Sequence, residues 1–240
     1  MSDLITSSRA GAVVTITIDR PGEGNVLTLE MLRALTTRLK EAGTTDAKVI
    51  ALRSTGDDFC KGREARGGPQ DPTALVMRDQ ILQPILDVYD ALANVPQPVV
   101  CAVQGAAYGF GCAMATAADV TIAAEGASFK LPEMTHNLPP TLAISALMTK
   151  VPRKAIAWMV YTLAEIDAPT AQALGIVSAV VPRAQLDAAV DAALASMSAR
   201  SSAALIAVKD YLRSAPMMEP RGAAAYGAAL LAGVLTSASR

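Results

Sequence analysis

The stretch VVCAVQGAAYGFGCAMATAAD, residues 99–119, decides the fold. Its first five residues are apolar and predict a buried strand, while the small residues of its second half predict a helix. Gly105, Gly109 and Gly111 lie between them, where glycine lets another group approach the backbone closely. The first N–H groups of a helix have no partner within it and attract negative charge. We therefore expect either a carbonyl oxygen that becomes negatively charged at this turn, or plain close packing of helix on strand.

The rest of the chain alternates strands with helices and then becomes helical. Further strands are predicted at 12–19, 47–54, 119–124 and 178–182. Helices are predicted at 29–43, 74–93, 141–150, 153–163, 169–174, 183–199, 202–213 and 222–235. Thr28 is expected to cap the first of these helices. Two long loops, 55–73 and 128–141, remain, and long ordered loops are often functional. The pattern predicts an α/β core followed by a helical end.

The composition argues against several classes of partner. The net charge is −1 and no basic stripe is interleaved with aromatic residues, so nucleic acid is not expected as the main partner. The longest apolar run, near 222–235, is too short and too rich in glycine to span a bilayer, and the first ten residues do not form a signal peptide. However, 52% of the residues are hydrophobic and the mean hydropathy is +0.33, so we expect apolar surface to be buried between subunits.

Cysteine and histidine are too few for several kinds of site. Cys60, Cys101 and Cys112 are widely spaced, so we expect buried thiols in a reduced, cytoplasmic protein rather than disulfides or metal ligands. His136 is the only histidine, which argues against a structural zinc site. A Ser-His-Asp hydrolase would have to use it, but no G-x-S-x-G sequence supplies the nucleophile. The glycine spacing fits neither a dinucleotide motif nor a P-loop.

Four motifs, in order, resemble those of the crotonase family, which has the enoyl-CoA hydratase/isomerase fold. They are IDRPGEGNVLTLEML (18–32), STGDDFCKGREA (54–65), PVVCAVQGAAYGFGCAMATAADVTIAAEGASFKLPE (98–133) and AQALGIVSAVVP (171–182). The resemblance covers nearly the whole chain. It implies an α/β fold of the ClpP/crotonase type, with a β-β-α spiral core over residues 1–182 and a C-terminal helical oligomerisation region over 183–240. Because family members form trimers or dimers of trimers, a homotrimer or homohexamer is expected.

The resemblance also implies an oxyanion hole made of two backbone N–H groups. One donor belongs to Arg63, which follows Gly62, and the other belongs to Phe110, between Gly109 and Gly111. Together they would polarise the thioester carbonyl of an acyl-CoA and stabilise the enolate formed from it. Removing one such donor typically costs about 10²- to 10³-fold in rate.

Glu133, in the sequence LPEM, falls on the catalytic glutamate of the family and is implied to move a proton beside the enolate. The residues expected to contact the coenzyme A ester are Lys61, Gly62, Gly109 and Gly111. Basic side chains that are candidates for its phosphates, with a solvated face as the alternative, are Lys61, Arg63, Arg66 and Lys130. Coenzyme A enters as part of the substrate, so neither a separate cofactor nor a metal is expected.

Ala113 departs from the pattern of the family's hydratases, which have a second glutamate three residues after the oxyanion donor. The spacing places Ala113 on the same helix face as Phe110, so we expect it to face the substrate pocket. Alanine neither activates water nor transfers a proton, which puts simple hydration in doubt. Isomerases of the family move a double bond from position 3 to position 2 with one glutamate, and Glu133 suits that role. His136 is either a group that recruits water or a structural or exposed residue.

The expected activity is therefore isomerisation or hydration of an enoyl-CoA, in fatty acid metabolism. The alternatives are an acyl-CoA thioester hydrolase or decarboxylase, which needs the same oxyanion hole, and a catalytically weak acyl-CoA-binding protein. Asp119 is expected to hold a turn by accepting hydrogen bonds from its own backbone. Tyr108 and Met77 are expected either to line the acyl pocket or simply to pack.

Overall fold

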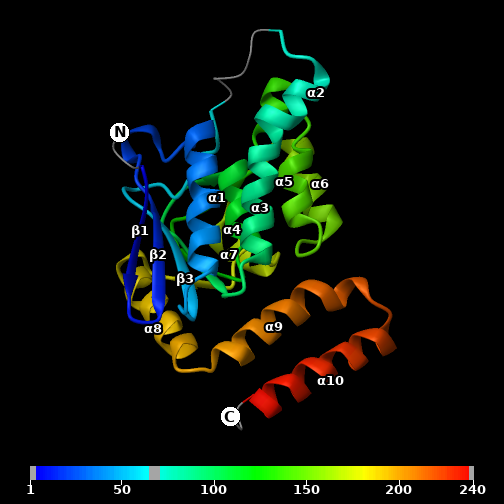
Figure 1. Cartoon of the computed structure of the whole chain (residues 1–240). Coiled ribbons are helices and arrows are strands. Elements are labelled where there is room, and N and C mark those ends of the chain that lie inside the picture. Colours follow the sequence, from blue (N-terminus) through cyan, green and yellow to red (C-terminus); the bar gives the residue numbers. More distant parts are fainter. Residues whose placement is uncertain (1–3, 65–70, 238–240) are drawn as a thin grey trace.

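The computed structural model describes residues 4–64 and 71–237. In this part of the chain, six strands form a central sheet in the order β1-β2-β3-β4-β6-β9. The first three of these strands lie side by side in Figure 1. Their bounds are β1 Ile5–Ala10, β2 Val13–Ile18, β3 Val49–Ser54, β4 Val99–Val103, β6 Val120–Ala124 and β9 Ala179–Val181. β1 and β2 are antiparallel and the remaining pairs are parallel. The predicted core strands are confirmed, and β1 is an addition whose residues are exposed apart from Ile5.

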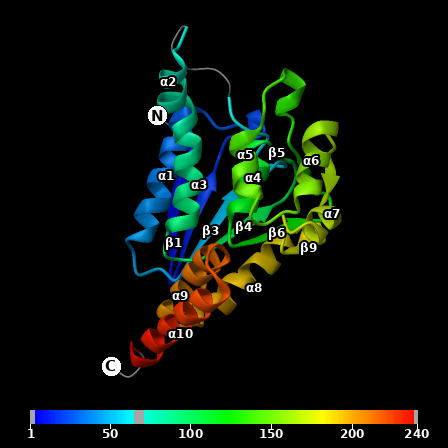
Figure 2. The ribbon, with the colours of Figure 1, turned by 90° about the vertical axis from the view of Figure 1, so that its right-hand side faces the viewer.

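Helices cover both faces of the central sheet, because successive residues of its strands point to opposite sides. Ile50 and Leu52 belong to the larger core, under α1 (Leu29–Gly43), α3 (Gln83–Asn94) and α4 (Phe110–Ala117). Val49 and Ala51 pack with α8 (Leu186–Ser198) on the opposite face (Figures 1 and 2). α1 begins as predicted, since Thr28 Oγ1 accepts a hydrogen bond from Met31 N at 3.1 Å.

The predicted helix over 74–93 contains an unexpected wider turn. It begins with α2 (Ala74–Val76), continues as a π-helical turn over Met77–Leu82 and becomes α3. Pro84 has no N–H to donate to the carbonyl of Gln80, so regular α-helical bonding is interrupted at this point.

A second, small sheet lies where only a loop was predicted. It has the order β5-β7-β8, with bounds Ala107–Tyr108, Ser128–Lys130 and Ile166–Asp167. Short 3₁₀ helices lie at Pro21–Glu23, Glu133–His136, Arg183–Gln185 and Ala215–Met217. The helices around this small sheet are α5 Thr141–Leu147, α6 Arg153–Thr162 and α7 Ala168–Ala173. The small sheet positions the candidate site described below.

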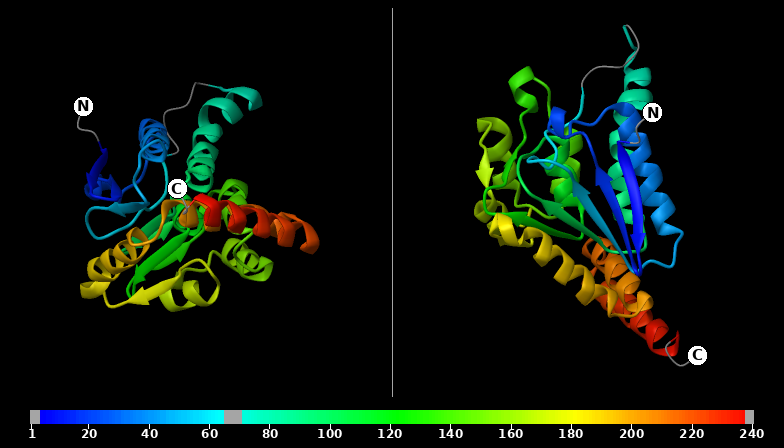
Figure 3. Two further views of the ribbon diagram at one scale, coloured as in Figure 1. Left: turned by 60° about the horizontal axis from the view of Figure 1, so that its bottom comes forward. Right: turned by 90° about the vertical axis from the view of Figure 1, so that its left-hand side faces the viewer.

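The last two helices form a hairpin that extends from the core (Figures 2 and 3). They are α9 (Ser202–Ser214) and α10 (Pro220–Ser237), which contact each other. α8 differs from them, because its buried face is part of the core of the central sheet. The division of the chain at residue 182 stays a prediction. None of the helices in the described residues has the length and apolar content needed to cross a membrane.

Lys209 anchors this hairpin to the core. Its buried ammonium group donates to Leu92 O at 2.8 Å and to Gln97 O at 3.1 Å, and it pairs with Asp119 Oδ2 at 2.8 Å. The same Asp119 oxygen accepts a hydrogen bond from Val99 N at 2.7 Å. The expectation that Asp119 holds its own turn was therefore wrong, since both recorded partners are distant in the sequence.

Candidate active site

Three neighbouring segments bring the predicted donors together, and β5 is the middle one. On one side, Cys60 forms a parallel bridge with Ala107, and Tyr108 N donates to Cys60 O at 2.9 Å. Arg63 lies three residues after Cys60, and Phe110 lies three residues after Ala107. Because paired parallel strands keep a common register, the two residues arrive at corresponding positions.

The third segment delivers Glu133 to the same place. β7 pairs with β5 on its other side, and Gly109 N donates to Lys130 O at 2.8 Å. Glu133 begins the 3₁₀ helix Glu133–His136 three residues later. A Cβ atom on Gly109 would lie 2.8 Å from Glu133 Oε1, which shows how closely the carboxyl group approaches this turn.

The N–H groups of Arg63 and Phe110 are available to a ligand. Within the part of the chain that the structure describes, neither donates a hydrogen bond, although Leu27 N donates to Gly62 O and Glu64 N donates to Leu27 O on either side of Arg63. Phe110 is the first residue of α4, so its N–H has no partner in the helix and lies at the positive end of the helix dipole. Both groups are therefore free to donate to a ligand, and their role as oxyanion donors stays a prediction.

The three glycines leave space for other parts of the chain, which lie very close to their backbone. A Cβ atom on Gly111 would lie 2.0 Å from Cys60 O, and one on Gly105 would lie 2.1 Å from Asp57 O. Gly109 has φ +50° and ψ −113°, a conformation that side-chain-bearing residues rarely adopt. The sequence posed a choice between a ligand and the packing of helix on strand. The structure adds a third answer, because the neighbouring loop and Glu133 occupy the space that side chains would need.

The Glu133 carboxyl group lies in a largely apolar setting. It is half-buried, and its Oε2 atom is buried without a hydrogen-bond partner in the described residues. Burial raises the pKa of Glu133 above its ordinary value, while the positive charge of Arg63 acts in the opposite direction. A carboxyl group with a raised pKa holds a proton more readily, which suits a group that takes a proton and returns it.

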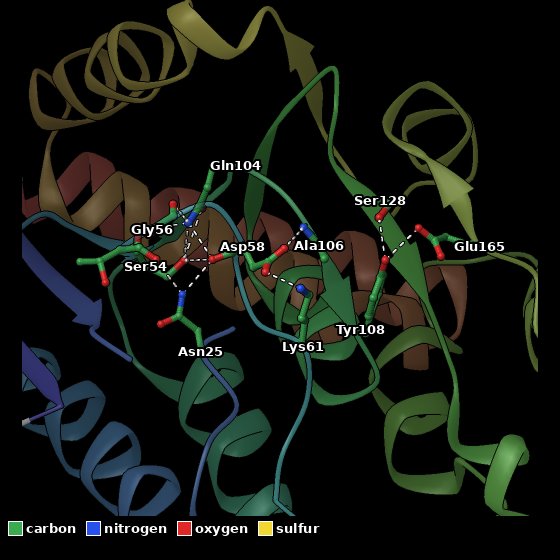
Figure 4. Close-up of polar contacts among 11 residues, drawn as sticks. Asn25, Ser54, Gly56, Asp58, Lys61, Gln104, Ala106, Tyr108, Ser128 and Glu165 are labelled. Atoms are coloured by element: carbon green, nitrogen blue, oxygen red, sulfur yellow. Dashed lines mark hydrogen bonds and ion pairs between the residues drawn. The ribbon is translucent and has the colours of Figure 1, made fainter. Parts of the chain in front are cut away.

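A buried polar network fixes the loop that leads to Arg63 (Figure 4). Asn25 is fully buried, and its Nδ2 atom donates to Thr55 O and Asp58 O, each at 2.8 Å. Gln104 Nε2 also donates to Asp58 O at 2.8 Å. No role for Gln104 was predicted from the sequence. Its position directly after a buried strand was the available signal.

The candidates for contact with coenzyme A are differently placed. Lys61 is partly exposed and pairs with Asp58 Oδ2 at 2.6 Å (Figure 4). Lys130, the last residue of β7, is half-buried. Arg66 lies outside the described residues. Contact of these residues with coenzyme A, and of Gly62, Gly109 and Gly111 with its thioester, stays a prediction.

Tyr108 belongs to the small sheet, and its hydroxyl group is held there. It donates to Glu165 Oε1 at 2.8 Å and lies 3.1 Å from Ser128 Oγ (Figure 4). Met77 is partly exposed, in the π-helical turn. An open cavity of about 440 Å³ lies beside this sheet, and its lining includes Lys61, Gln104 and Tyr108. The residues Arg63, Phe110 and Glu133 do not line this cavity.

Ala113 and His136 supply no second acid to this site. Ala113 is fully buried in the main hydrophobic core. His136 is exposed, and its imidazole ring has no recorded hydrogen bond within the described part of the chain. The three cysteines are buried and free, as predicted. Burial raises the pKa of Cys60 and of Cys112 to about 12, so these thiols are poor nucleophiles.

Tyr89 is a neighbour of the site that the sequence did not reveal. Its ring stacks on that of Phe110, with centroids 5.6 Å apart and an interplanar angle of 18°. Burial and the negative charge of Glu133 raise the pKa of its hydroxyl group, while the positive charge of Arg63 acts in the opposite direction. In the sequence Tyr89 is one residue of an amphipathic helix, and nothing in that pattern separates it from a core residue.

Comparisons with known proteins identify the family of this chain. The sequence model described as enoyl-CoA hydratase/isomerase matches residues 8–231. The chain is 34% identical to the 2,3-dehydroadipyl-CoA hydratase of Escherichia coli (strain K12) over 217 residues, which are 89% of this chain and 82% of the relative. It is 32% identical over 188 residues to the mitochondrial enoyl-CoA hydratase domain-containing protein 3 of Rattus norvegicus, covering 76% of this chain. That match spans 61% of the length of the rat protein.

Solved structures have the same fold. An enoyl-CoA hydratase from Mycobacterium smegmatis superposes with a TM-score of 0.92 at 26% identity, covering 97% of this chain and 91% of the other. The predicted α/β fold, with its C-terminal helical region, is therefore confirmed.

Proposed function

Because the chain belongs to the enoyl-CoA hydratase/isomerase family, the crotonase family, we propose that it is an acyl-CoA enzyme that forms and reprotonates a thioester enolate. One observation carries the proposal. Three adjacent segments carry the Oε2 atom of Glu133 and the N–H groups of Arg63 and Phe110, and none of these groups has a hydrogen-bond partner among the described residues. The names of the relatives support an unsaturated acyl-CoA as the class of substrate.

In the proposed reaction, the thioester oxygen of a 3-enoyl-CoA accepts hydrogen bonds from the Arg63 and Phe110 N–H groups. The Glu133 carboxylate removes a proton from C2, and the electron pair of the broken C–H bond moves towards the carbonyl oxygen to give a dienolate. The two N–H groups stabilise the negative charge on that oxygen. Glu133 then returns the proton to C4, the carbonyl re-forms, and the double bond lies between C2 and C3. Atoms and charge balance without a further reactant.

We propose isomerisation rather than hydration because proton transfer is assigned to one carboxyl group, that of Glu133. By the resemblance, Ala113 takes the sequence position of the second glutamate of the hydratases, and His136 is exposed. Coenzyme A enters as part of the substrate, and the reaction as written uses no separate cofactor. A cytoplasmic location, a role in fatty acid metabolism and assembly as a homotrimer or homohexamer are further parts of the proposal.

Turnover of a short 3-enoyl-CoA tests the proposal. We expect its conversion to the 2-enoyl-CoA to be faster than the hydration of crotonyl-CoA, with both reactions followed by mass spectrometry and chromatography. A protein that binds acyl-CoA thioesters without converting any of them would be the weak binding protein that the missing second acid also suggests. Release of free coenzyme A, or of carbon dioxide from a malonyl-type ester, would favour the hydrolase or decarboxylase instead.

A further inference from the structure

Arg63 contributes a charged side chain to this region besides its backbone donor. The guanidinium group is half-buried, and its recorded hydrogen bond runs from Nη1 to Glu64 O at 3.2 Å. It forms no ion pair within the described residues, whereas half-buried Arg20 pairs with Glu64 at 2.6 Å and Arg53 pairs with Asp187 at 2.7 Å. The segment 65–70 that follows Arg63 in the sequence, ARGGPQ, contains no acidic residue. Arg63 is thus a half-buried cation that forms no direct ion pair among the described residues, although the charge of Glu133 acts on it.

The hydroxyl group of Tyr89 is a second donor without an acceptor. It makes no hydrogen bond within the described part of the chain, although the side chain is half-buried. The stack of its ring on Phe110 fixes Tyr89 beside an oxyanion donor. The Glu133 carboxyl group lies against Gly109, the residue before Phe110, and the charges of Glu133 and Arg63 both act on the Tyr89 hydroxyl group, so the three groups lie in one region.

Glu133 does not satisfy either donor. It forms no direct ion pair with Arg63, and its Oε2 atom has no hydrogen-bond partner among the residues that the structure describes. A ligand that carries a hydrogen-bond acceptor could therefore pair with both donors. A planar guanidinium group with a neighbouring hydroxyl donor matches a carboxylate, which accepts two parallel hydrogen bonds from arginine and a third from another donor.

We propose that the acyl group of the substrate carries a carboxylate, which the Arg63 guanidinium binds with help from the Tyr89 hydroxyl. This inference rests on the proposed function in one respect, since the acyl-CoA must bind with its thioester at the Arg63 and Phe110 N–H groups. The ion pair also has a consequence for Glu133. Arg63 neutralises the negative charge of the substrate carboxylate, which would otherwise hinder ionisation of the Glu133 carboxyl group.

Binding of unreactive saturated esters tests the inference separately from turnover. The probes are succinyl-, glutaryl- and adipyl-CoA, each paired with an acyl-CoA in which an isopropyl group replaces the carboxylate. Dissociation constants are measured by calorimetry, with free coenzyme A as the reference ligand. For at least one pair we expect wild type to bind the carboxylated ester about 10- to 100-fold more tightly, as a charged hydrogen bond in a poorly hydrated site provides.

Side-chain variants then assign the preference. Arg63→Met keeps the backbone N–H and removes the charge, so the preference should disappear, while Arg63→Lys should retain part of it. Tyr89→Phe should reduce it several-fold. Circular dichroism and thermal melting establish that each variant is folded.

Two results would overturn the inference. In the first, wild type binds both members of every pair equally well. In the second, Arg63→Met weakens free coenzyme A as much as every ester, which would place the guanidinium on the coenzyme. If the preference is found but no enoyl-CoA is converted, the proposed function fails and the carboxylate site stands. If turnover is found without the preference, the carboxylate site alone fails.

Discussion

At the scale of single residues, Gly111 shows how the fold and the site depend on the same atoms. The methyl group of an alanine there would lie 2.0 Å from Cys60 O, so α4 and the loop that carries Arg63 would have to separate. We predict that Gly111→Ala lowers turnover about 10²- to 10³-fold, the cost of a misplaced oxyanion donor, and lowers the free energy of unfolding by about 1–3 kcal/mol. Steady-state kinetics and denaturant titration measure both effects.

Gly126 provides the matched control for this substitution. A Cβ atom there would meet nothing within 4 Å, and its φ is not positive. Gly126→Ala should therefore leave turnover and stability close to those of wild type. Equal activity in Gly111→Ala and Gly126→Ala would show that the close approach at Cys60 does not position the donor.

Glu133 links catalysis to pH. Because its pKa is raised, the ionised base is lost at a higher pH than for an ordinary glutamate, whose pKa is about 4.3. The kcat/KM profile should fall on the acidic side with an apparent pKa above that value, and Glu133→Gln should lower turnover about 10²-fold or more. An acidic limb at or below the ordinary glutamate pKa would assign the proton transfer to another group.

The same pKa shift predicts a change in stability. The native state binds the Glu133 proton more tightly than the unfolded state does. The resulting stabilisation is present below the unfolded pKa and is lost as the pH rises through the native pKa. Glu133→Gln should therefore raise the melting temperature at neutral pH, and the gain should shrink in acid. The exposed Glu125→Gln is the control and should show no such pH-dependent gain.

At the scale of elements, Lys209 links α9 to the core through buried polar contacts that the sequence did not predict. Lys209→Met would leave Asp119 without its cation and two carbonyl groups without their donor. Because removing one partner of a buried ion pair is costly, we predict a loss of about 3 kcal/mol in the free energy of unfolding. Lys154→Met, at an exposed position of α6, should change stability little. A small effect at both positions would show that apolar packing alone holds the hairpin.

The sequence predicted elements with local signals better than those that depend on distant partners. α1, its Thr28 cap and the parallel core strands follow from periodicity and capping within a few residues. The strands of the small sheet have two or three residues each, too few for a periodic pattern. They form because Cys60 and Lys130, distant in sequence, supply their hydrogen-bond partners.

The motifs predicted the three main residues of the candidate site, but they did not predict the neighbouring groups that support these residues. The motifs placed Arg63, Phe110 and Glu133 in one site, and the structure brings their segments together. Tyr89 could not be predicted, because its role depends on the packing of α3 against Phe110. The contact between Gly111 and Cys60 O was equally hidden, since no residue pattern records the distance between two backbones.

At the scale of the whole molecule, the α9–α10 hairpin presents an apolar face that bears on assembly. Val208, Leu212 and Leu231 are more than half exposed and line a groove of about 290 Å³ between the two helices. Because a monomer would leave this surface in water, we predict a trimer or hexamer in sedimentation experiments at micromolar concentration. Leu212→Glu combined with Leu231→Glu should shift the protein towards monomer, while Ala203→Glu, outside the groove, should not. A monomeric wild-type protein would contradict this prediction.

The central claim is that one carboxyl group and two backbone donors move a proton along an acyl-CoA. The most direct test is incubation of trans-3-hexenoyl-CoA in heavy water with wild type, Glu133→Gln and Gly111→Ala, followed by mass spectrometry of the products over time. We predict that wild type forms the 2-enoyl-CoA with little 3-hydroxyacyl-CoA, and that both variants form it far more slowly. Rapid formation of 3-hydroxyacyl-CoA by wild type, or equal rates in wild type and Glu133→Gln, would contradict the account.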